Sequence, residues 1–404
     1  MVSLSRRTLL GGAGAAIGAA GLSGVARAAD TPNAVQLPFG NGERPLVRYA
    51  GKRPLLQMTS RPPQLETPFA VFNDGVITPN DAFFVRYHLA NIPLEIDPDT
   101  FRLEVKGKVN TPLSLSLADL KAMESTEIVA VNQCSGNSRG FFEPRVAGGQ
   151  LANGAMGNAR WKGVPLKAVL DKAGVQAGAV QVSFDGLDGP VLPETPDFVK
   201  ALDIDHARDG EVMLAYSMNN EDLPWLNGFP LRLVVPGYYG TYWMKHVHEI
   251  TVLDHAFDGF WMKSAYRIPA NSCACTEPGK PPTTTVPIGR FNVRSFITSL
   301  ADGARVPANT ETMVRGIAFD GGYGISGAAL SADGGETWAE ARLGDDLGRY
   351  SFRAWQAPIT LPKGEHTLMV RAINRIGQSQ PMQPLWNPAG YMRNVVETVH
   401  VKAA

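Results

Sequence analysis

The sequence predicts two domains, an α+β domain followed by an all-β sandwich of immunoglobulin-like architecture. From Phe101 onward, alternating β-runs are interrupted by short segments with helix caps, which is typical of a mixed fold. Residues 271–287 are rich in proline and threonine, a composition typical of a linker. After this segment, short β-runs separated by Asp-Gly, Gly-Gly and Lys-Gly turns continue toward the C-terminus. A chain of 404 residues also exceeds one ordinary hydrophobic core.

The N-terminus has the features of an export signal. Arg6 and Arg7 form a twin-arginine start, and a Gly- and Ala-rich apolar stretch follows from Leu9 to Val25. Residues 26–29 then give a small-residue cleavage pattern. A transmembrane anchor is the alternative, but Gly and Ala are weakly hydrophobic and the stretch ends in a cleavage pattern. We therefore expect residues 1–29 to be a twin-arginine signal peptide, with export to the periplasm and no membrane span after cleavage.

Residues 30–285 are expected to form the first domain. Up to about residue 100 the segment is rich in proline and turn residues and holds one short strand candidate, residues 83–88. The alternation from Phe101 predicts a strand, and Ser116 is a capping residue for a short helix that reaches Met123. A further helix, ended by Gly174, and three further strands are predicted, in chain order, at residues 127–131 (strand), 164–173 (helix), 180–184 (strand) and 231–235 (strand).

Residues 286–404 are expected to form the second domain. Strands recur about every ten residues with no convincing helix, which is typical of a sandwich. The clearest examples are residues 312–317, 327–331, 339–343 and 366–372. The domain lacks the paired cysteines of an antibody fold, so only the architecture is implied.

Charge and cysteine content narrow the function classes. The 38 basic and 38 acidic residues balance, and removal of residues 1–29 would leave three more acidic than basic residues, unlike a nucleic-acid binder. Three cysteines are an odd count, so at least one thiol is unpaired within the chain. Cys273 and Cys275 are too closely spaced for an unstrained disulfide, and we assign them only a role in loop structure. The chain has no C-x-x-C-H motif and therefore no haem attachment site, so electrons would leave to a separate protein.

Cys134 is the most informative residue. It ends a β-branched run and is followed by Ser135-Gly136-Asn137, so its thiol is expected at a strand tip, on a turn flexible enough to expose it. A thiolate is a soft, strong ligand for a transition metal. A buried structural thiol would be the better interpretation for an isolated cysteine, but the motifs elsewhere in the chain favour a metal ligand.

The segment from Val131 to Arg139 resembles the cysteine loop of the sulfite oxidase family of molybdenum enzymes. The resemblance, closest to bacterial periplasmic sulfite dehydrogenases, runs from about Asn73 to the C-terminus. Several other segments match motifs of this family in order and spacing. These are residues 84–89, 157–166, 227–232, 236–245 and 260–267.

The resemblance implies a molybdenum-molybdopterin cofactor with Cys134 as metal ligand. Arg86 and Arg139 would bind sulfite through forked hydrogen bonds, and Tyr266 would assist them. The family pattern further implies a set of cofactor-binding residues: His88, Cys134, Ser135, Asn227, Arg232 and Lys245. Within this set the arginine and the lysine suit the pterin phosphate, and the histidine can donate to the cofactor or titrate near pH ~6.5.

Two positions depart from the animal members of this family. Asn227 replaces a histidine and cannot become cationic. Residues 386–389, Trp-Asn-Pro-Ala, stand where a third substrate arginine would follow Trp-Asn-Leu. Arg353 and Arg393 are the candidates to replace that arginine. The substrate pocket is therefore expected to be less cationic.

Three other features have competing interpretations. Trp161 either walls the substrate pocket or packs in the core. His246 and His248 alternate along a predicted strand and would project from one face, but no third metal ligand is evident, so we expect a structural role. Residues 254–258 contain an Asp-His pair that suggests a catalytic triad, but no nucleophilic serine elbow accompanies it, so we reject that interpretation.

The resemblance therefore implies periplasmic oxidation of sulfite to sulfate, with electrons passed one at a time to a c-type cytochrome. The second domain resembles the dimerisation domain of the family, which implies a homodimer, and a heterodimer with a cytochrome subunit is the competing assembly. One alternative function keeps the cofactor but acts on another sulfur compound, as a sulfoxide reductase or a dehydrogenase of another sulfur anion. The other is a non-catalytic periplasmic binding protein, which would tolerate Cys134→Ser.

Overall fold

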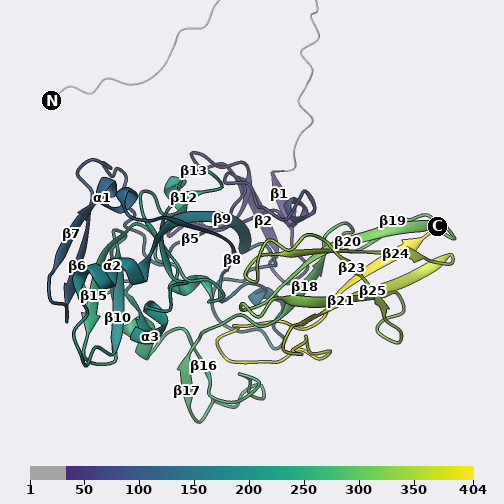
Figure 1. Ribbon diagram of the computed structural model, residues 1–404. Helices are drawn as coiled ribbons and strands as arrows, with labels where there is room; N and C mark the ends of the chain where they lie inside the picture. Colours follow the sequence, from purple (N-terminus) through teal and green to yellow (C-terminus); the bar gives the residue numbers. More distant parts are fainter. Residues whose placement is uncertain (1–32) are drawn as a thin grey trace, which may run out of the picture.

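The computed structural model describes residues 33–404, so the predicted signal peptide lies outside the described residues. Figure 1 shows a strand-rich body with a few short helices and, beside it, an elongated β-sandwich built from the C-terminal part of the chain. The predicted α+β domain followed by an all-β sandwich is confirmed. Between residues 33 and 404, no helix has both the length and the apolar character needed to cross a membrane.

A five-stranded sheet opens the described chain, where the sequence predicted a single strand. Its order follows the chain: β1 (Ala34–Gln36), β2 (Glu43–Val47), β3 (Leu55–Thr59), β4 (Gln64–Glu66) and β5 (Val85–Arg86). The prediction missed most of this sheet because its strands have two to five residues, too few for a clear alternation between turn signals. The predicted strand at residues 83–88 is reduced to the two residues of β5, which pair with β4.

A second sheet has the order β11-β10-β15-β6-β7, with β15 and β6 parallel and the other pairs antiparallel. Its strands are β6 (Arg102–Gly107), β7 (Leu113–Ser116), β10 (Gln181–Gly186), β11 (Lys200–Asp203) and β15 (Val247–Leu253). Helix α1 (Leu117–Ala122) follows β7. As predicted, Ser116 caps this helix, and its side chain accepts a hydrogen bond from the backbone N–H of Asp119. The short helices α3 (Ile204–Ala207) and α4 (Phe260–Lys263) follow β11 and β15.

A third sheet has the order β13-β12-β9-β8, with β14 also paired to β12. Its strands are β8 (Thr126–Gln133), β9 (Met156–Pro165), β12 (Met213–Met218), β13 (Glu221–Asp222) and β14 (Arg232–Val234). Helix α2 (Leu166–Ala173) ends at Gly174, as predicted, but begins two residues later than predicted. Val164 belongs to β9, where it pairs with Leu214, because the buried strand continues up to Pro165.

The predicted linker is in part a hairpin. Strand β16 (Arg267–Pro269) pairs with β17 (Thr285–Pro287), and the pair projects from the body (Figure 1). The loop between them holds a disulfide between Cys273 and Cys275, with Cα atoms 5.1 Å apart, so the expectation of no disulfide was wrong. Ala274 lies between them in the left-handed region, with φ 49°, which turns the chain enough to bring both cysteines within the usual range.

Two sheets packed face to face form the C-terminal sandwich. One has the order β18 (Arg294–Ile297), β20 (Glu311–Phe319), β24 (Arg353–Thr360) and β23 (Arg342–Leu343). The other has the order β19 (Ala304–Val306), β26 (Glu397–Ala403), β25 (Gly364–Asn374), β21 (Ile325–Ser331) and β22 (Ala339–Glu340). Buried side chains from both sheets, including Val314, Trp355 and Leu368, form one core between them.

The sandwich also contacts the first domain closely. Phe352 packs edge-on against Phe72, with ring centroids 6.0 Å apart, and both belong to the larger core of the body. Arg294 is fully buried, and its Nη2 donates to Ser138 Oγ at 3.0 Å and to Glu397 Oε1 at 2.8 Å. Since Ser138 lies in the turn after Cys134, the C-terminal sandwich supports the cysteine loop directly.

We expect Glu66 to make the stability of the protein depend on pH. Its carboxyl group is buried and accepts a hydrogen bond from Ala152 N at 2.7 Å, and burial raises its pKa from 4.5 to about 8. The folded state therefore retains this proton between pH 4.5 and about 8, while the unfolded state releases it. The resulting stabilisation is complete below pH 4.5 and is lost as the pH rises through about 8.

Glu66→Gln removes the titrating group and keeps the shape of the side chain. Between pH 5 and pH 9 the wild type should lose roughly 3–5 kcal/mol more of its free energy of unfolding than the variant does. Urea unfolding of both proteins at several pH values measures this difference. Parallel pH profiles for the two proteins would contradict the assignment.

Candidate active site

Strand β8 carries Cys134 into a pocket of the body. The strand pairs with β9 up to its last residue, Gln133, and backbone hydrogen bonds hold the turn that follows. Cys134 N donates to Ala155 O at 2.9 Å, and Asn137 N donates to Cys134 O at 3.0 Å. The cysteine is only 8% exposed. The expected flexible, exposed turn is therefore corrected to a buried, hydrogen-bonded one whose free thiol lines the pocket.

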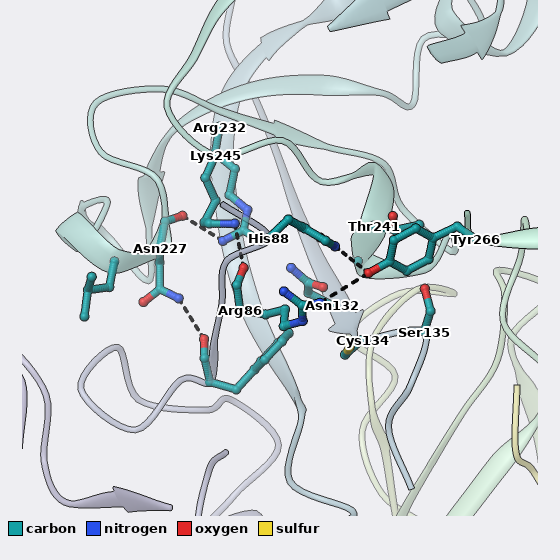
Figure 2. Close-up of a pocket in the computed structure, with 13 residues that line it drawn as sticks. Arg86, His88, Asn132, Cys134, Ser135, Asn227, Arg232, Thr241, Lys245 and Tyr266 are labelled. Atoms are coloured by element: carbon teal, nitrogen blue, oxygen red, sulfur yellow. Dashed lines mark hydrogen bonds between the residues drawn. The ribbon is translucent and has the colours of Figure 1, made fainter. Parts of the chain in front are cut away.

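Thirteen residues from distant parts of the chain line this pocket (Figure 2). Eight of them were predicted as site residues: Arg86, His88, Cys134, Ser135, Asn227, Arg232, Lys245 and Tyr266. The first domain alone supplies all thirteen, since their numbers run from 84 to 266. The structure therefore brings together every predicted site residue except Arg139.

Three cationic side chains, those of Arg86, Arg232 and Lys245, concentrate positive charge in the pocket. Arg232 Nη1 donates to Asn227 O at 2.7 Å, and burial lowers the pKa of this arginine to about 10. Lys245 Nζ donates to Arg86 O at 2.7 Å, and burial lowers the pKa of this lysine to about 7, although nearby Asp188 opposes the shift. These buried cations have few negative charges near them. The binding of an anion in the pocket is therefore favoured, because it would stabilise the charged forms of Arg232 and Lys245.

The pocket also contains buried polar atoms that have no hydrogen-bond partner within residues 33–404. They belong to pocket-lining side chains: both amide atoms of Asn132, Ser135 Oγ, Thr241 Oγ1, Arg232 Nε and His88 Nδ1. Buried polar groups in proteins are nearly always paired, so such a group of unpaired atoms indicates a polar ligand that completes them. The same described residues contain no cluster of three or more His, Cys, Asp and Glu side chains that could hold a metal. A metal ion here would depend on Cys134 and on ligands that a cofactor supplies.

His88 and Tyr266 form a hydrogen-bonded pair beside the thiol. His88 Nε2 lies in a short contact with Tyr266 Oη, and Arg86 Nη2 lies 3.5 Å from the same oxygen (Figure 2). Burial, with the charges of Arg86 and Lys245, holds the pKa of His88 well below its usual value. The expected titration near neutral pH is therefore corrected, because the buried imidazole stays neutral there. Burial also raises the pKa of Tyr266, so its phenol stays protonated.

The backbone of Tyr266 is strained. This bulky residue lies in the left-handed region, with φ 56°, a conformation that costs free energy and clusters at functional sites. Its ring stacks on Tyr391 of the C-terminal segment, with ring centroids 5.3 Å apart and planes 9° apart. The second domain therefore supports the position of this side chain in the pocket.

Arg139 lies beside the pocket rather than in it. Its Nε donates to Ala389 O at 3.2 Å, its Nη1 donates to Gly149 O at 3.4 Å, and its guanidinium carbon lies 5.0 Å from the centre of the Tyr391 ring. The guanidinium also packs against Gly136, where an added Cβ would lie 2.7 Å from it. These contacts place the guanidinium against the cysteine loop and the Tyr391 ring, outside the pocket lining.

The two candidate replacements for the third arginine do not line the pocket either. Arg393 pairs with Glu397 at 2.5 Å, and Arg353 pairs with Asp346 at 3.1 Å. Trp161 is fully buried and donates to Ala130 O at 3.0 Å, so it packs in the core and does not wall the pocket. Neither Arg353 nor Arg393 therefore replaces the third substrate arginine in the pocket lining.

His246 and His248 do not form the geometry expected from strand alternation. Strand β15 begins at Val247, and His246 lies before it with φ 51°. His246 bonds to Tyr87 Oη at 2.6 Å and to Phe229 O at 2.5 Å, whereas His248 lies 4.0 Å from Asp185. The predicted structural role fits these contacts for His246, which is fully buried.

Sequence reasoning missed several residues of the site. Asn132 precedes Cys134 by two positions on β8, so strand alternation places both on one face and could have identified it. Thr241 lies inside the segment already matched to the family, residues 236–245. Lys52 carried no signal, although its Nζ donates to Asn227 Oδ1 at 2.5 Å in the structure.

We expect Asn227→Ala to destabilise the folded protein at the end of the pocket where Arg232 and Lys245 lie. The Asn227 side chain accepts from Lys52 and donates to Phe84 O at 3.0 Å, so its loss leaves a buried ammonium and a buried carbonyl each short of a partner. The free energy of unfolding should fall by about 1–3 kcal/mol, and the molybdenum content of the purified protein should fall with it. Alanine at the exposed Asn91 is the matched control. Unchanged stability and metal content would contradict the role given to this amide.

Comparison with known proteins agrees with this geometry. Residues 88–261 match the family model described as oxidoreductase molybdopterin binding domain, and residues 285–404 match the Mo-co oxidoreductase dimerisation domain. The chain is 34% identical to mitochondrial sulfite oxidase from Homo sapiens over 369 residues, which cover 87% of this chain and 66% of that protein. It is 32% identical to sulfite oxidase from Gallus gallus, with 87% of this chain and 79% of that protein covered.

A solved structure gives the same result. The sulfane dehydrogenase SoxCD from Paracoccus pantotrophus superposes with a TM-score of 0.74 at 26% identity, covering 89% of this chain and 88% of that chain. The chain spans about two thirds of the length of the human enzyme. Both domains of the chain are therefore matched, with the pocket in the first of them. The chain belongs to the sulfite oxidase family of molybdopterin-binding oxidoreductases.

Proposed function

We propose that this protein oxidises sulfite to sulfate in the periplasm and passes the electrons one at a time to a c-type cytochrome. One observation carries the proposal: a buried thiol, three cations and a set of unpartnered polar atoms line a single pocket. This arrangement fits a molybdopterin, which bears a phosphate and sulfur ligands, and a small sulfur oxyanion beside it. The family relationship supports the same reading.

The residues divide the pocket into two ends. Arg232, Lys245 and Asn227 lie together at the end away from the thiol, where they suit the pterin phosphate (Figure 2). Cys134 and Ser135 lie at the other end, below the ring of Tyr266 (Figure 2). Cys134 would ligate molybdenum, and the unpartnered hydroxyl of Ser135 and amide of Asn132 would complete the hydrogen bonds of the cofactor.

The protein binds and orients the substrate anion. The bound molybdenum cofactor supplies the oxygen transfer and takes up the two electrons released when sulfite and water give sulfate and two protons. Arg86 would bind a sulfite oxygen through its planar, cationic guanidinium. In the tautomer that carries its proton on Nε2, His88 donates to Tyr266 Oη and leaves the phenol O–H free to donate to the substrate.

The test is sulfite-dependent reduction of cytochrome c by the exported protein, with ferricyanide as a second acceptor. We expect sulfite to drive the reduction of both acceptors. Activity with ferricyanide alone would remove the cytochrome from the proposal and leave the oxidation of sulfite. No activity with either acceptor, in protein that contains molybdenum, would overturn the assignment of sulfite.

A second candidate function keeps the cofactor and changes the sulfur substrate. It is favoured by the position of Arg139 outside the pocket lining, which leaves Arg86 and Arg232 as the arginines that line the pocket. The relative from Paracoccus pantotrophus is itself described as a sulfane dehydrogenase. The two candidates are separated by adding sulfite, thiosulfate or a sulfoxide to protein that contains molybdenum and measuring which compound changes its absorbance.

The location and assembly are part of the proposal. The twin-arginine segment at Arg6 and Arg7 supports export, and the match of residues 285–404 to a dimerisation domain supports a homodimer. A heterodimer with a cytochrome subunit is the competing assembly. Fractionation of the producing cells tests the first point. Light scattering of the purified protein tests the second, because a homodimer has twice the mass of the mature chain and no haem absorbance.

A further inference from the structure

The disulfide between Cys273 and Cys275 is a chemical feature that the proposed function does not use. It lies in the loop of the β16–β17 hairpin, which projects from the body (Figure 1), and both cysteines are only partly buried. Ala274, the one residue between them, is held at φ 49°, a conformation that costs an L-residue free energy. Disulfides that are accessible to solvent are the ones most open to attack by nucleophiles.

An open groove gives access to this disulfide from one side. Cys275 lines the groove, together with Thr276, Glu277 and Lys280. Thr276 Oγ1 is buried and has no hydrogen-bond partner within residues 33–404. The ammonium group of Lys280 is exposed and paired with Glu277 at 2.5 Å. The groove that Cys275 lines is therefore also lined by an exposed Lys280–Glu277 ion pair.

We propose that Cys275 is a site of covalent modification by sulfite, which cleaves the Cys273–Cys275 disulfide. The sulfur lone pair of sulfite attacks Cys275 Sγ, and a new S–S bond forms as the bond to Cys273 breaks. The bonding electron pair leaves on Cys273 Sγ as a thiolate, which takes a proton from water. The products are an S-sulfonate on Cys275 and a thiol on Cys273, and no outside oxidant or reductant is needed.

The contacts of the loop assign the two cysteines different roles. Cys275 faces the groove, and its backbone is held by Asn271, which accepts from Cys275 N at 3.1 Å and donates to Cys275 O at 2.8 Å. Cys273 does not line the groove, and its Sγ lies 3.4 Å from Asn271 Oδ1. Because Cys275 and not Cys273 lines the groove, sulfite reaches Cys275 Sγ and Cys273 is the leaving group. Once protonated by water, the Cys273 thiol can donate to Asn271 Oδ1.

Modification of Cys275 is a reaction separate from the proposed oxidation of sulfite. The choice of sulfite as the nucleophile rests on the proposed function, but cleavage of the disulfide does not require molybdenum.

The test is made on wild-type protein, which is incubated anaerobically with excess sulfite and without an electron acceptor, so that sulfite is not consumed. Iodoacetamide then captures the released thiol, and intact-mass and peptide mass spectrometry locate both groups. The double variant Cys273→Ser/Cys275→Ser is the matched control.

We expect one sulfonate on Cys275, one alkylated thiol on Cys273, and neither in the double variant. Lys280→Gln should slow the reaction about two- to fivefold and Glu277→Gln should speed it by a similar factor, since one charge near an anion in water is worth about 1 kcal/mol. An intact disulfide, under conditions that cleave oxidised glutathione in the same tube, would overturn the proposal, as would a sulfonate on Cys273. Protein that is modified but does not oxidise sulfite would count against the proposed function alone.

Discussion

Replacement of Cys134 by serine is expected to lower sulfite oxidation by more than about 100-fold. Loss of residues that merely support a metal ligand already costs 10- to 100-fold, so loss of the ligand itself should cost more. Serine keeps the size of the side chain, and the backbone bonds of the turn to Ala155 and Asn137 do not involve the thiol. The folded structure should therefore survive while the molybdenum centre is changed. Steady-state rates per molybdenum and the absorbance spectrum of the loaded protein measure the effect.

The matched control for this variant is Cys273→Ser/Cys275→Ser. That disulfide lies in the projecting hairpin and lines no part of the active-site pocket, so its loss should leave the rate of sulfite oxidation within about twofold of the wild type. A Cys134→Ser variant that keeps wild-type activity would refute the ligand assignment. It would also favour the interpretation of Cys134 as a structural thiol.

Replacement of Arg86 by methionine is expected to reduce kcat/KM for sulfite by about 100- to 1000-fold, with much of the loss in KM. The estimate corresponds to about 2.7–4 kcal/mol for one charged donor aimed at the reacting anion. Arg86 lines the pocket and lies 3.5 Å from Tyr266 Oη, so its side chain is in reach of a small anion beside the thiol. Methionine keeps much of the length of the side chain and removes its charge.

Arg139→Met provides the contrast that makes this prediction sharp. The Arg139 guanidinium is engaged by Ala389 O, Gly149 O and the ring of Tyr391, so its removal should lower kcat/KM by less than about tenfold, through the packing of Tyr391 against Tyr266. Measurement of kcat and KM for both variants separates direct from indirect effects. Equal losses in the two variants would contradict the placement of Arg139 outside the substrate pocket.

The sequence could locate the pocket because its motifs resemble those of the sulfite oxidase family in order and spacing, and several of them adjoin a strand. Cys134 follows the last residue of a strand, and alternation along that strand puts Asn132 on the same face. Arg232 opens strand β14, which pairs in register with β12. Of the eight predicted residues in the pocket, only Arg86 and Arg232 lie within a strand, so the family resemblance and not local pattern identified the set.

The direction of a long side chain could not be predicted in the same way. Arg139 follows the cysteine loop at the family spacing, but its guanidinium is held by Ala389 and Tyr391, which lie about 250 positions later in the chain. Similarly, the neutral state of His88 depends on burial and on three cations brought close by the fold, Arg86, Lys245 and Lys200. Such effects arise from tertiary packing and leave no local trace in the sequence.

Backbone conformations outside the common regions were also missed. The left-handed φ of Ala274 allows a disulfide that the spacing of Cys273 and Cys275 argued against. His246, also left-handed, lies outside the strand that would have placed it beside His248. Non-glycine residues rarely adopt a left-handed conformation, so a prediction from residue type alone assigns Ala274 and His246 a negative φ.

The most direct test of the account is a single-turnover experiment on the molybdenum-loaded protein. The protein is mixed anaerobically with a small excess of sulfite and no electron acceptor, and sulfate is quantified while the absorbance is followed. The account predicts about one sulfate per bound molybdenum, with an absorbance change that is absent from Cys134→Ser. Loaded wild-type protein that forms no sulfate and keeps its spectrum, while it responds to another sulfur compound, would contradict the assignment of sulfite as substrate.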